Sequence, residues 1–141
     1  MGCGTGIIFG VDKLPVPPQE AIIYEDDKLY ICLATYPITK GHTIVVWKNK
    51  AEDLHLLRRK DYEYLMDMVD IARDSLLETL KIKKVYLIYM DEVKQVHWHL
   101  IPRYDERGFN ILMHEPKENK DFSLTFELSR TFINKKQKLQ F

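Results

Sequence analysis

The 141-residue sequence has few cysteines and no excess of either charge. Its two cysteines, Cys3 and Cys32, are too few for a disulfide scaffold and lack the spacing of metal ligands, which favours a reducing cytoplasm. Lys plus Arg and Asp plus Glu each total 21, so no net charge attracts nucleic acid or an anionic membrane. We therefore expect a cytoplasmic protein without nucleic-acid or membrane partners.

Long hydrophobic runs are also missing. The longest, "HTIVVW" and "VYLIYM", fall far short of the roughly 20 apolar residues that span a bilayer, and we recognise no signal peptide. Hydrophobic residues make up 45% and charged residues 30% of the chain, which is typical of a folded globular protein. This length and composition predict one compact domain.

The glycines and prolines divide the chain into three parts. Residues 1–20 hold four of the six glycines and three of the six prolines, which predicts an irregular N-terminal arm. Residues 21–104 contain the clearest apolar patterns of strands and helices, which predicts that they form the core domain. Residues 105–141 are a C-terminal extension, either packed on the domain or mobile; within it, residues 123–132 fit a strand or a helix, and residues 133–141 resemble a mobile basic end.

Five short segments carry strand patterns, and one long segment has a helical period. Helical spacing of Leu65, Val69, Ala72, Leu76 and Leu80 predicts a helix over residues 61–80. The apolar, β-branched and aromatic runs predict strands near 21–25, 28–34, 42–48, 83–90 and 95–101, and a short helix fits 51–58.

The connections between these segments indicate the fold class. Residues 25–28 and 91–94 are short enough to join antiparallel neighbours. We predict an α+β fold: a five-stranded antiparallel sheet with one long and one short helix packed on it. Both tryptophans lie in apolar alternation, with Trp98 expected in the core and Trp47 at an edge or interface.

The stretch "QVHWHLIPRY" begins with Gln95 and carries two histidines, His97 and His99. In a strand these three side chains share one face, opposite Val96 and Trp98. Three simple interpretations are an exposed polar face, a zinc site, and buried core histidines. A closed zinc site needs four ligands, and the sequence lacks the ligand spacing of such a site, so we predict no metal. The alternation of the histidines with Val96 and Trp98 argues against core histidines.

The same stretch resembles the signature of the histidine triad (HIT) family, alternating histidines followed by Pro-Arg. "AIIYEDDKLYICL", Pro37, "KGHTIVVWKNKAEDL" and the long helix follow in the family's order, so the resemblance covers residues 21–104. It implies a nucleotide hydrolase or nucleotidyl transferase that cleaves a phosphoanhydride or phosphoramidate at the α-phosphorus through a covalent nucleotidyl-histidine. Dinucleoside polyphosphates and adenylyl amides are the implied substrates, and a homodimer without a cofactor is the implied assembly.

The resemblance assigns roles by position. His97 corresponds to the nucleophilic histidine, and a neutral imidazole suits that role near pH 7. His99 would stabilise charge on the phosphate oxygens. His42 corresponds to a histidine that reaches the triad from a neighbouring strand, although it is equally consistent with a polar residue beside a turn. Arg103 corresponds to the Pro-Arg arginine, with a phosphate-binding or ion-pair role.

Three positions depart from the family pattern. Gln95 replaces the first histidine of the triad, where the family residue supports and orients the others. Ala34 stands where many members carry an Asp or Asn that binds the ribose hydroxyls. Residues 90–94, "MDEVK", replace a glycine-rich phosphate-binding segment and introduce Asp91 and Glu92. These changes leave open a second hypothesis, a non-catalytic nucleotide- or partner-binding protein that retains the fold.

Overall fold

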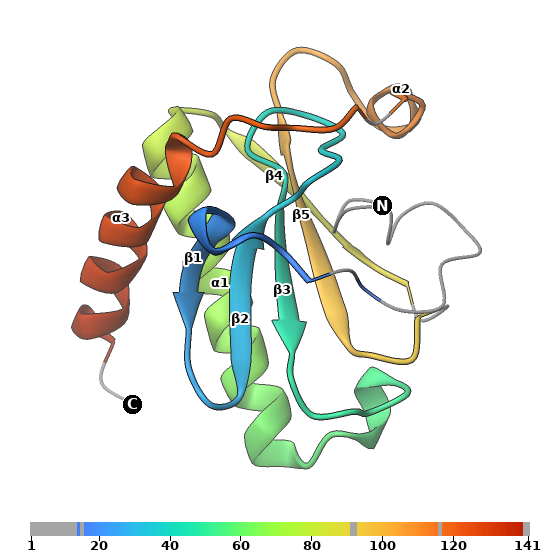
Figure 1. Ribbon diagram of the computed structural model, residues 1–141, viewed down its shortest axis with the longest axis vertical. Helices are drawn as coiled ribbons and strands as arrows, with labels where there is room; N and C mark the ends of the chain where they lie inside the picture. Colours follow the sequence, from blue (N-terminus) through green and yellow to red (C-terminus); the bar gives the residue numbers. More distant parts are fainter. Residues whose placement is uncertain (1–13, 15, 91–92, 116, 140–141) are drawn as a thin grey trace.

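The computed structural model describes residues 14, 16–90, 93–115 and 117–139, which form one antiparallel sheet with two long helices on one of its faces (Figure 1). The strands lie in the order β1-β2-β3-β5-β4, and every neighbouring pair is antiparallel. Their bounds are Ile22–Glu25 (β1), Leu29–Leu33 (β2), Thr43–Trp47 (β3), Lys84–Tyr89 (β4) and His97–Arg103 (β5). The predicted fold class is therefore confirmed.

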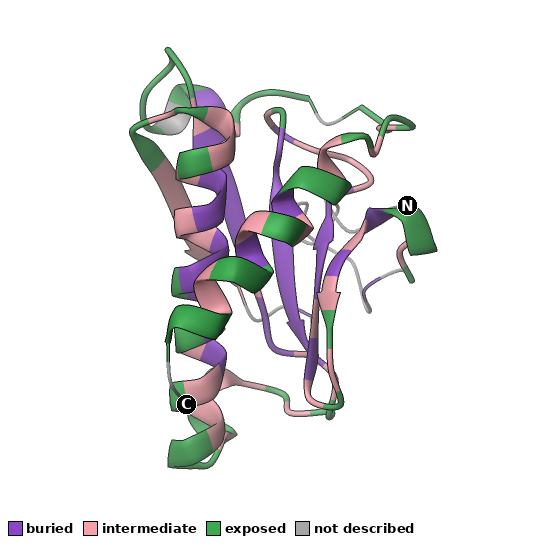
Figure 2. Ribbon diagram, turned by 90° about the vertical axis from the view of Figure 1, so that its left-hand side faces the viewer, coloured by how far each residue is buried: buried purple, intermediate pink, exposed green. Residues whose placement is uncertain are grey.

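Two long helices, α1 (Arg59–Leu80) and α3 (Leu124–Lys138), pack against each other, and α3 also packs on β1. Figure 2 shows that α1 turns its buried residues toward the sheet, whose central strands are themselves buried. Three shorter elements complete the fold: the 3-10 helices Gln19–Ala21 (η2) and Leu54–Leu56 (η3), and the four-residue helix Phe109–Leu112 (α2). The short helix predicted over 51–58 is thus a single 3-10 turn.

Helix α1 follows from its apolar period. Leu65, Val69, Ala72 and Leu76 are buried as the spacing predicts, while Leu80, at the end of the stripe, is only partly buried. The helix ends at Lys81, whose φ of 55° is left-handed and whose N–H donates to the Leu77 carbonyl, which stops the helical ladder.

The C-terminal helix differs from the sequence-based prediction. Helix α3 continues to Lys138, so most of the segment predicted as a mobile basic end is helical. Leu128 and Phe132 are fully buried against the core, and the Phe132 ring lies 4.9 Å from the ring of Tyr24 on β1. Apolar residues four apart place both side chains on one helix face, and burial of that face stabilises the helix where propensity alone left the choice open.

The prediction for Trp47 was wrong. Trp47 is 2% exposed: it ends β3, the central strand of the sheet, and its side chain lies in the main hydrophobic core. Trp98 packs against the core but remains partly exposed. Alternation identifies a buried face but not a strand's place in the sheet, and that place decides how deeply each tryptophan lies.

Asp26 fixes the turn between β1 and β2. Its carboxylate accepts hydrogen bonds from the Lys28 and Leu29 N–H groups at 2.8 and 2.9 Å and from the hydroxyls of Tyr24 and Tyr64. Burial by itself would raise the pKa of Asp26, but these four hydrogen bonds outweigh burial and lower its pKa below the ordinary value. The hairpin therefore depends on an ionised carboxylate.

We expect Asp26→Asn to lower the free energy of unfolding by about 1–2 kcal/mol at pH 7, because it weakens charge-assisted hydrogen bonds. A carboxyl whose pKa is lowered by folding stabilises the fold above its unfolded pKa and loses that contribution as the pH falls through its folded pKa. The difference between the two proteins, measured by urea unfolding, should therefore shrink toward pH 3. An equal difference at both pH values would exclude this carboxylate as the cause.

Candidate active site

The structure brings three histidines together on the face of the sheet that α1 and α3 leave uncovered. His97 and His99 are carried by β5, and His42 immediately precedes β3, whose Ile44 pairs with His99. The rings of His97 and His99 have centroids 5.0 Å apart, and those of His42 and His99 5.2 Å apart. All three are at most 1% exposed. Burial corrects the expectation that these histidines avoid the core, because alternation separates two faces without showing that both are covered.

A chain of hydrogen bonds sets the tautomers of two of these rings. The Ile38 N–H donates to Nδ1 of His42 at 3.0 Å, so a neutral His42 carries its proton on Nε2. That Nε2 lies 3.0 Å from Nδ1 of His99 and donates to it. A neutral His99 then carries its proton on Nε2, a buried donor that has no hydrogen-bond acceptor among the described residues. The arrangement leaves one N–H ready for an anionic oxygen.

Both rings are held neutral. Burial lowers the pKa of His42 to about 3. Burial also lowers the pKa of His99 well below its ordinary value, with further lowering from the nearby His42 and His97. A second proton would place a charge in a buried site where no described residue supplies a carboxylate partner, which is costly. At neutral pH the two rings are therefore uncharged, and the hydrogen bond from the Ile38 N–H fixes which nitrogen is protonated first in His42 and then in His99.

His97 is oriented by a different backbone group. Its Nδ1 lies 2.8 Å from the carbonyl oxygen of Gln95, which can only accept, so Nδ1 carries the proton. The lone pair of a neutral His97 is then on Nε2. A lone pair on a ring nitrogen fixed by a backbone carbonyl is what nucleophilic attack on phosphorus requires.

Gln95 supports this arrangement through its backbone and not through its side chain. Strand β5 begins at His97, two residues later than predicted, so Gln95 precedes it. The Gln95 side-chain amide donates to the Trp47 carbonyl at 3.0 Å, which ties the entry of β5 to the end of β3. Because any residue supplies a carbonyl, the absence of a histidine here does not remove the group that orients His97.

Arg103 lies apart from the histidines. It ends β5 four residues after His99, about 13 Å along an extended strand. Between them, Ile101 packs with Ile38 and Ile111 in a small second core. The structure therefore brings together four of the five predicted site residues and leaves Arg103 at a different groove.

Two of the three departures from the family pattern can be located. Ala34 is 1% exposed and its N–H donates to the His42 carbonyl at 2.8 Å, so its backbone braces the loop while its methyl offers no hydrogen bond to a ribose. Gln95 is the second. Asp91 and Glu92, expected to repel phosphate unless they point away or take part in proton transfer, lie outside the described residues.

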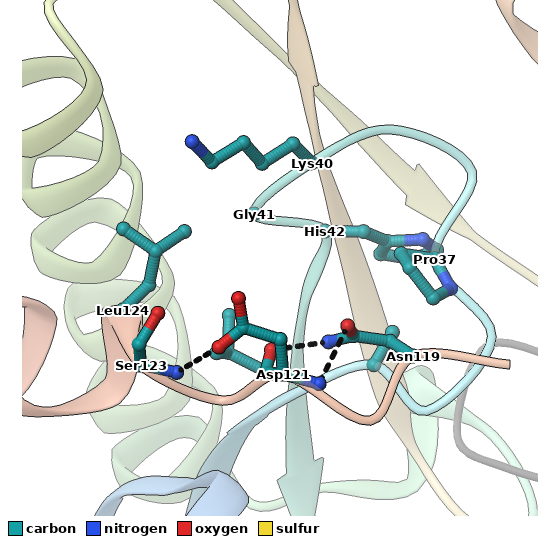
Figure 3. A pocket seen from close by; sticks show the side chains of 10 residues that line it. Pro37, Lys40, Gly41, His42, Asn119, Asp121, Ser123 and Leu124 are labelled. Carbon is teal, nitrogen blue, oxygen red and sulfur yellow. Dashed lines mark hydrogen bonds between the residues drawn. The ribbon is translucent and has the colours of Figure 1, made fainter.

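A cavity of about 360 Å³ lies beside His42, between residues 34–42 and residues 119–124 of the C-terminal extension. Figure 3 shows the His42 ring directed toward Pro37 and away from this cavity. Asp121 accepts a hydrogen bond from the Ser123 N–H at 2.9 Å, which is the main cause that lowers the pKa of Asp121. The loop that carries His42 therefore lines the cavity, but the ring nitrogens of His42 do not point into it.

Sequence reasoning missed Ile38, whose backbone is the origin of the hydrogen-bond chain through His42 to His99. No side-chain signal could have found it, because the contribution is an N–H that every residue except proline has. Among the described residues, no group of three or more His, Cys, Asp or Glu is arranged to hold a metal ion.

Gly41 positions His42 through its backbone. Its φ of +87° is disfavoured for other residues, and an added Cβ would lie 2.8 Å from Cδ1 of Leu80 and 3.4 Å from Cγ of Pro102. We expect Gly41→Ala to lower the free energy of unfolding by about 1–2 kcal/mol and to reduce activity by displacing His42, as measured by urea unfolding and turnover.

Gly108→Ala is the control for this substitution. Gly108 also has a positive φ, +54°, but nothing lies within 4 Å of its added Cβ. This variant should lose stability through strain alone and keep its activity. If both variants kept full activity, the geometry of Gly41 would have no part in positioning His42.

Comparisons with known proteins agree with this architecture. Residues 18–106 match the HIT domain. A HIT-like protein of Mesomycoplasma hyorhinis, described as uncharacterized, is 34% identical over 59% of this chain and 80% of its own. The adenosine 5'-monophosphoramidase of Saccharomyces cerevisiae is 27% identical over 92% of this chain and 81% of its own. The crystal structure of a hypothetical histidine triad nucleotide-binding protein from Sulfolobus tokodaii superposes with a TM-score of 0.69 at 21% identity, covering 84% of this chain and 87% of that one.

The five-stranded antiparallel sheet and the histidines on its central strands define a protein with the HIT fold. Because the HIT domain match spans well over half of the sequence, the chain belongs to the histidine triad family, a family of nucleotide-binding proteins and hydrolases.

Proposed function

We propose that this protein cleaves a nucleotide phosphoanhydride or phosphoramidate at the α-phosphorus, with His97 as the nucleophile. The observation that supports this most directly is the assignment of ring protons. The Gln95 carbonyl holds Nδ1–H of His97, and the chain from Ile38 through His42 leaves Nε2–H on His99. One buried histidine is thereby an electron-pair donor and its neighbour a hydrogen-bond donor, as attack on phosphorus requires.

The first step forms a bond between Nε2 of His97 and phosphorus and breaks the bond from phosphorus to the leaving oxygen or nitrogen. The leaving group departs with the bonding electron pair and takes up a proton from solvent. His99 donates a hydrogen bond from its Nε2–H to a phosphoryl oxygen as negative charge develops there, and the hydrogen bond from His42 to Nδ1 of His99 keeps the His99 proton on Nε2. Water then attacks phosphorus and the bond from phosphorus to Nε2 of His97 breaks, which releases the nucleoside monophosphate, passes a water proton to solvent and restores neutral His97. The covalent intermediate thus splits one displacement into two easier ones.

Adenylyl amides are the substrate class that we place first. The yeast relative that aligns with 92% of this chain is an adenosine 5'-monophosphoramidase, and an amine leaving group departs readily once protonated. Dinucleoside polyphosphates, which the family resemblance implies, are the second class. Both deliver a nucleotidyl group to the same histidine and differ only in what leaves.

The test is a substrate screen of adenosine 5'-phosphoramidate and dinucleoside polyphosphates, with release of a nucleoside monophosphate as the readout. Quenching with base on the time scale of one turnover, which preserves the acid-labile bond between phosphorus and imidazole, followed by mass spectrometry at alkaline pH, should show a nucleotidyl adduct on the peptide that contains His97. An adduct confined to another peptide would reject His97 as the nucleophile. Turnover without any adduct would favour direct attack by water.

A second candidate is a non-catalytic nucleotide- or partner-binding protein. Ala34 favours it, because a buried methyl group cannot hold ribose hydroxyls. Calorimetric binding of a nucleoside monophosphate without turnover of any amide or polyphosphate would support this candidate, and a trapped adduct would exclude it.

The remaining partners follow from the family resemblance. We propose a cytoplasmic homodimer that needs no cofactor and binds no nucleic acid. Strand β4 is an edge strand of the described sheet, so a second copy could extend the sheet there. Light scattering at micromolar concentration tests the dimer, and a single monomeric species would reject it.

In the described part of the chain, no helix is long and apolar enough to cross a membrane.

A further inference from the structure

A basic groove lies where α1 ends and β4 begins beside the end of β5. It has a volume of about 370 Å³, and its charged lining consists of Lys81, Lys83, Lys84, Arg103 and Asp105. Four cations therefore face one carboxylate, in a protein whose total charge is zero. We call these five residues the basic groove.

The cations of the basic groove have no ion-pair partner among the residues that the structure describes. Some lysines elsewhere pair with carboxylates, as Lys28 does with Asp61 at 3.2 Å and Lys48 with Glu25 at 2.7 Å, whereas exposed lysines such as Lys50 and Lys60 form no ion pair with described residues. None of the four groove cations forms an ion pair with any described residue. The surplus positive charge is therefore local and unbalanced.

The register of the sheet adds a cost to this surplus. Lys84 and Arg103 are directly opposite on the antiparallel strands β4 and β5, so their side chains share one face. Like charges in directly opposite positions destabilise a sheet. In addition, Nε of Arg103 is buried and has no hydrogen-bond acceptor among the described residues. An anion bound between the two side chains would offset both costs.

The donor groups and the volume of the basic groove indicate what kind of anion fits. The planar guanidinium of Arg103 presents several donors that match phosphate oxygens, and the lysines add point charges. A volume of about 370 Å³ is that of a small-molecule site. A nucleic-acid backbone or a membrane surface would need an extended basic track, whereas the four cations here line one small groove.

We propose that the basic groove binds a compact oligophosphate, a group that carries several negative charges on neighbouring phosphates. The site goes beyond the proposed chemistry, because the apolar cluster around Ile101 separates Arg103 from the histidines. Free oligophosphate and the phosphate tail of a nucleotide have the same chemistry here.

Isothermal titration calorimetry with tripolyphosphate, at fixed ionic strength, tests the proposal on the full chain. We expect Lys84→Gln/Arg103→Gln to raise the dissociation constant about tenfold or more, since it removes two charge-assisted contacts. The control Lys50→Gln/Lys60→Gln removes the same charge from two exposed lysines that form no ion pair with described residues, and it should leave binding nearly unchanged. Equal weakening by both pairs, or no binding by the unmodified protein, would overturn the proposal.

Two further arms identify the source and separate this site from the histidines. If the groove substitutions weaken ATP binding as much as tripolyphosphate binding, and adenosine does not bind, the natural ligand is the phosphate tail of a nucleotide. If only tripolyphosphate binding depends on the groove residues, the natural ligand is free oligophosphate. Either result supports the groove. His97→Ala should retain tripolyphosphate binding whether or not the proposed catalysis is correct. Loss of binding in that variant would place the ligand at the histidines and reject the basic groove.

Discussion

Replacing His97 with Ala is expected to lower the rate of nucleotidyl transfer by about a thousandfold or more and to abolish the covalent adduct. The variant lacks the imidazole that the Gln95 carbonyl orients through Nδ1, and with it the Nε2 lone pair proposed to attack phosphorus. A thousandfold loss corresponds to about 4 kcal/mol of transition-state stabilisation, a modest expectation for the loss of a covalent nucleophile. Single-turnover measurements with adenosine 5'-phosphoramidate provide the rate.

Gln95→Ala is the matched control for this experiment. It removes the side-chain amide bonded to Trp47 but keeps the carbonyl that accepts from His97. Its activity should stay within about tenfold of the unmodified protein, because one hydrogen bond is worth about 1 kcal/mol. Thermal unfolding verifies that both variants are folded. Equal activity of His97→Ala and the unmodified protein would remove His97 from the mechanism.

The second large effect concerns stability. Phe132→Ala should lower the free energy of unfolding by about 3–5 kcal/mol, the range for removing a buried aromatic side chain. Phe132 is fully buried and packs on Tyr24, so its loss leaves a cavity between α3 and β1. Urea unfolding measures the change.

Phe126→Ala provides the comparison on the same helix. Phe126 is 71% exposed, so its replacement should change stability by less than about 0.5 kcal/mol. A similar loss in both variants would mean that burial of Phe132 is not the cause of the loss, because Ala has the higher helix propensity at both positions. A small change in both would mean that α3 contributes little to folding.

Local patterns predicted much of this fold. Short apolar runs located all five strands, and the connections "EDDK" and "DEVK" correctly made their strands antiparallel neighbours. The spacing of Leu65 and Leu76 identified the buried face of α1. These features depend on residues close together in sequence, whose periodicity is visible without the fold.

Other features depended on contacts between distant segments. The choice between strand and helix for residues 123–132 was settled by packing of α3 on α1 and β1. The place of Trp47 followed from strand order, which no single strand encodes. Arg103 follows the histidines closely in the signature, yet strand extension and the cluster around Ile101 carry it to the basic groove.

By itself the sequence determined the identity of the chemical groups and, through its family resemblance, which histidine to test. Tertiary structure alone decided how those groups are protonated. The proton of His42 is fixed by the Ile38 N–H, and that of His97 by the Gln95 carbonyl, and both depend on where the backbone runs. A sequence lists which rings can hold a proton, but the hydrogen-bond partner on the opposite nitrogen decides where it resides, and that partner is positioned only by folding.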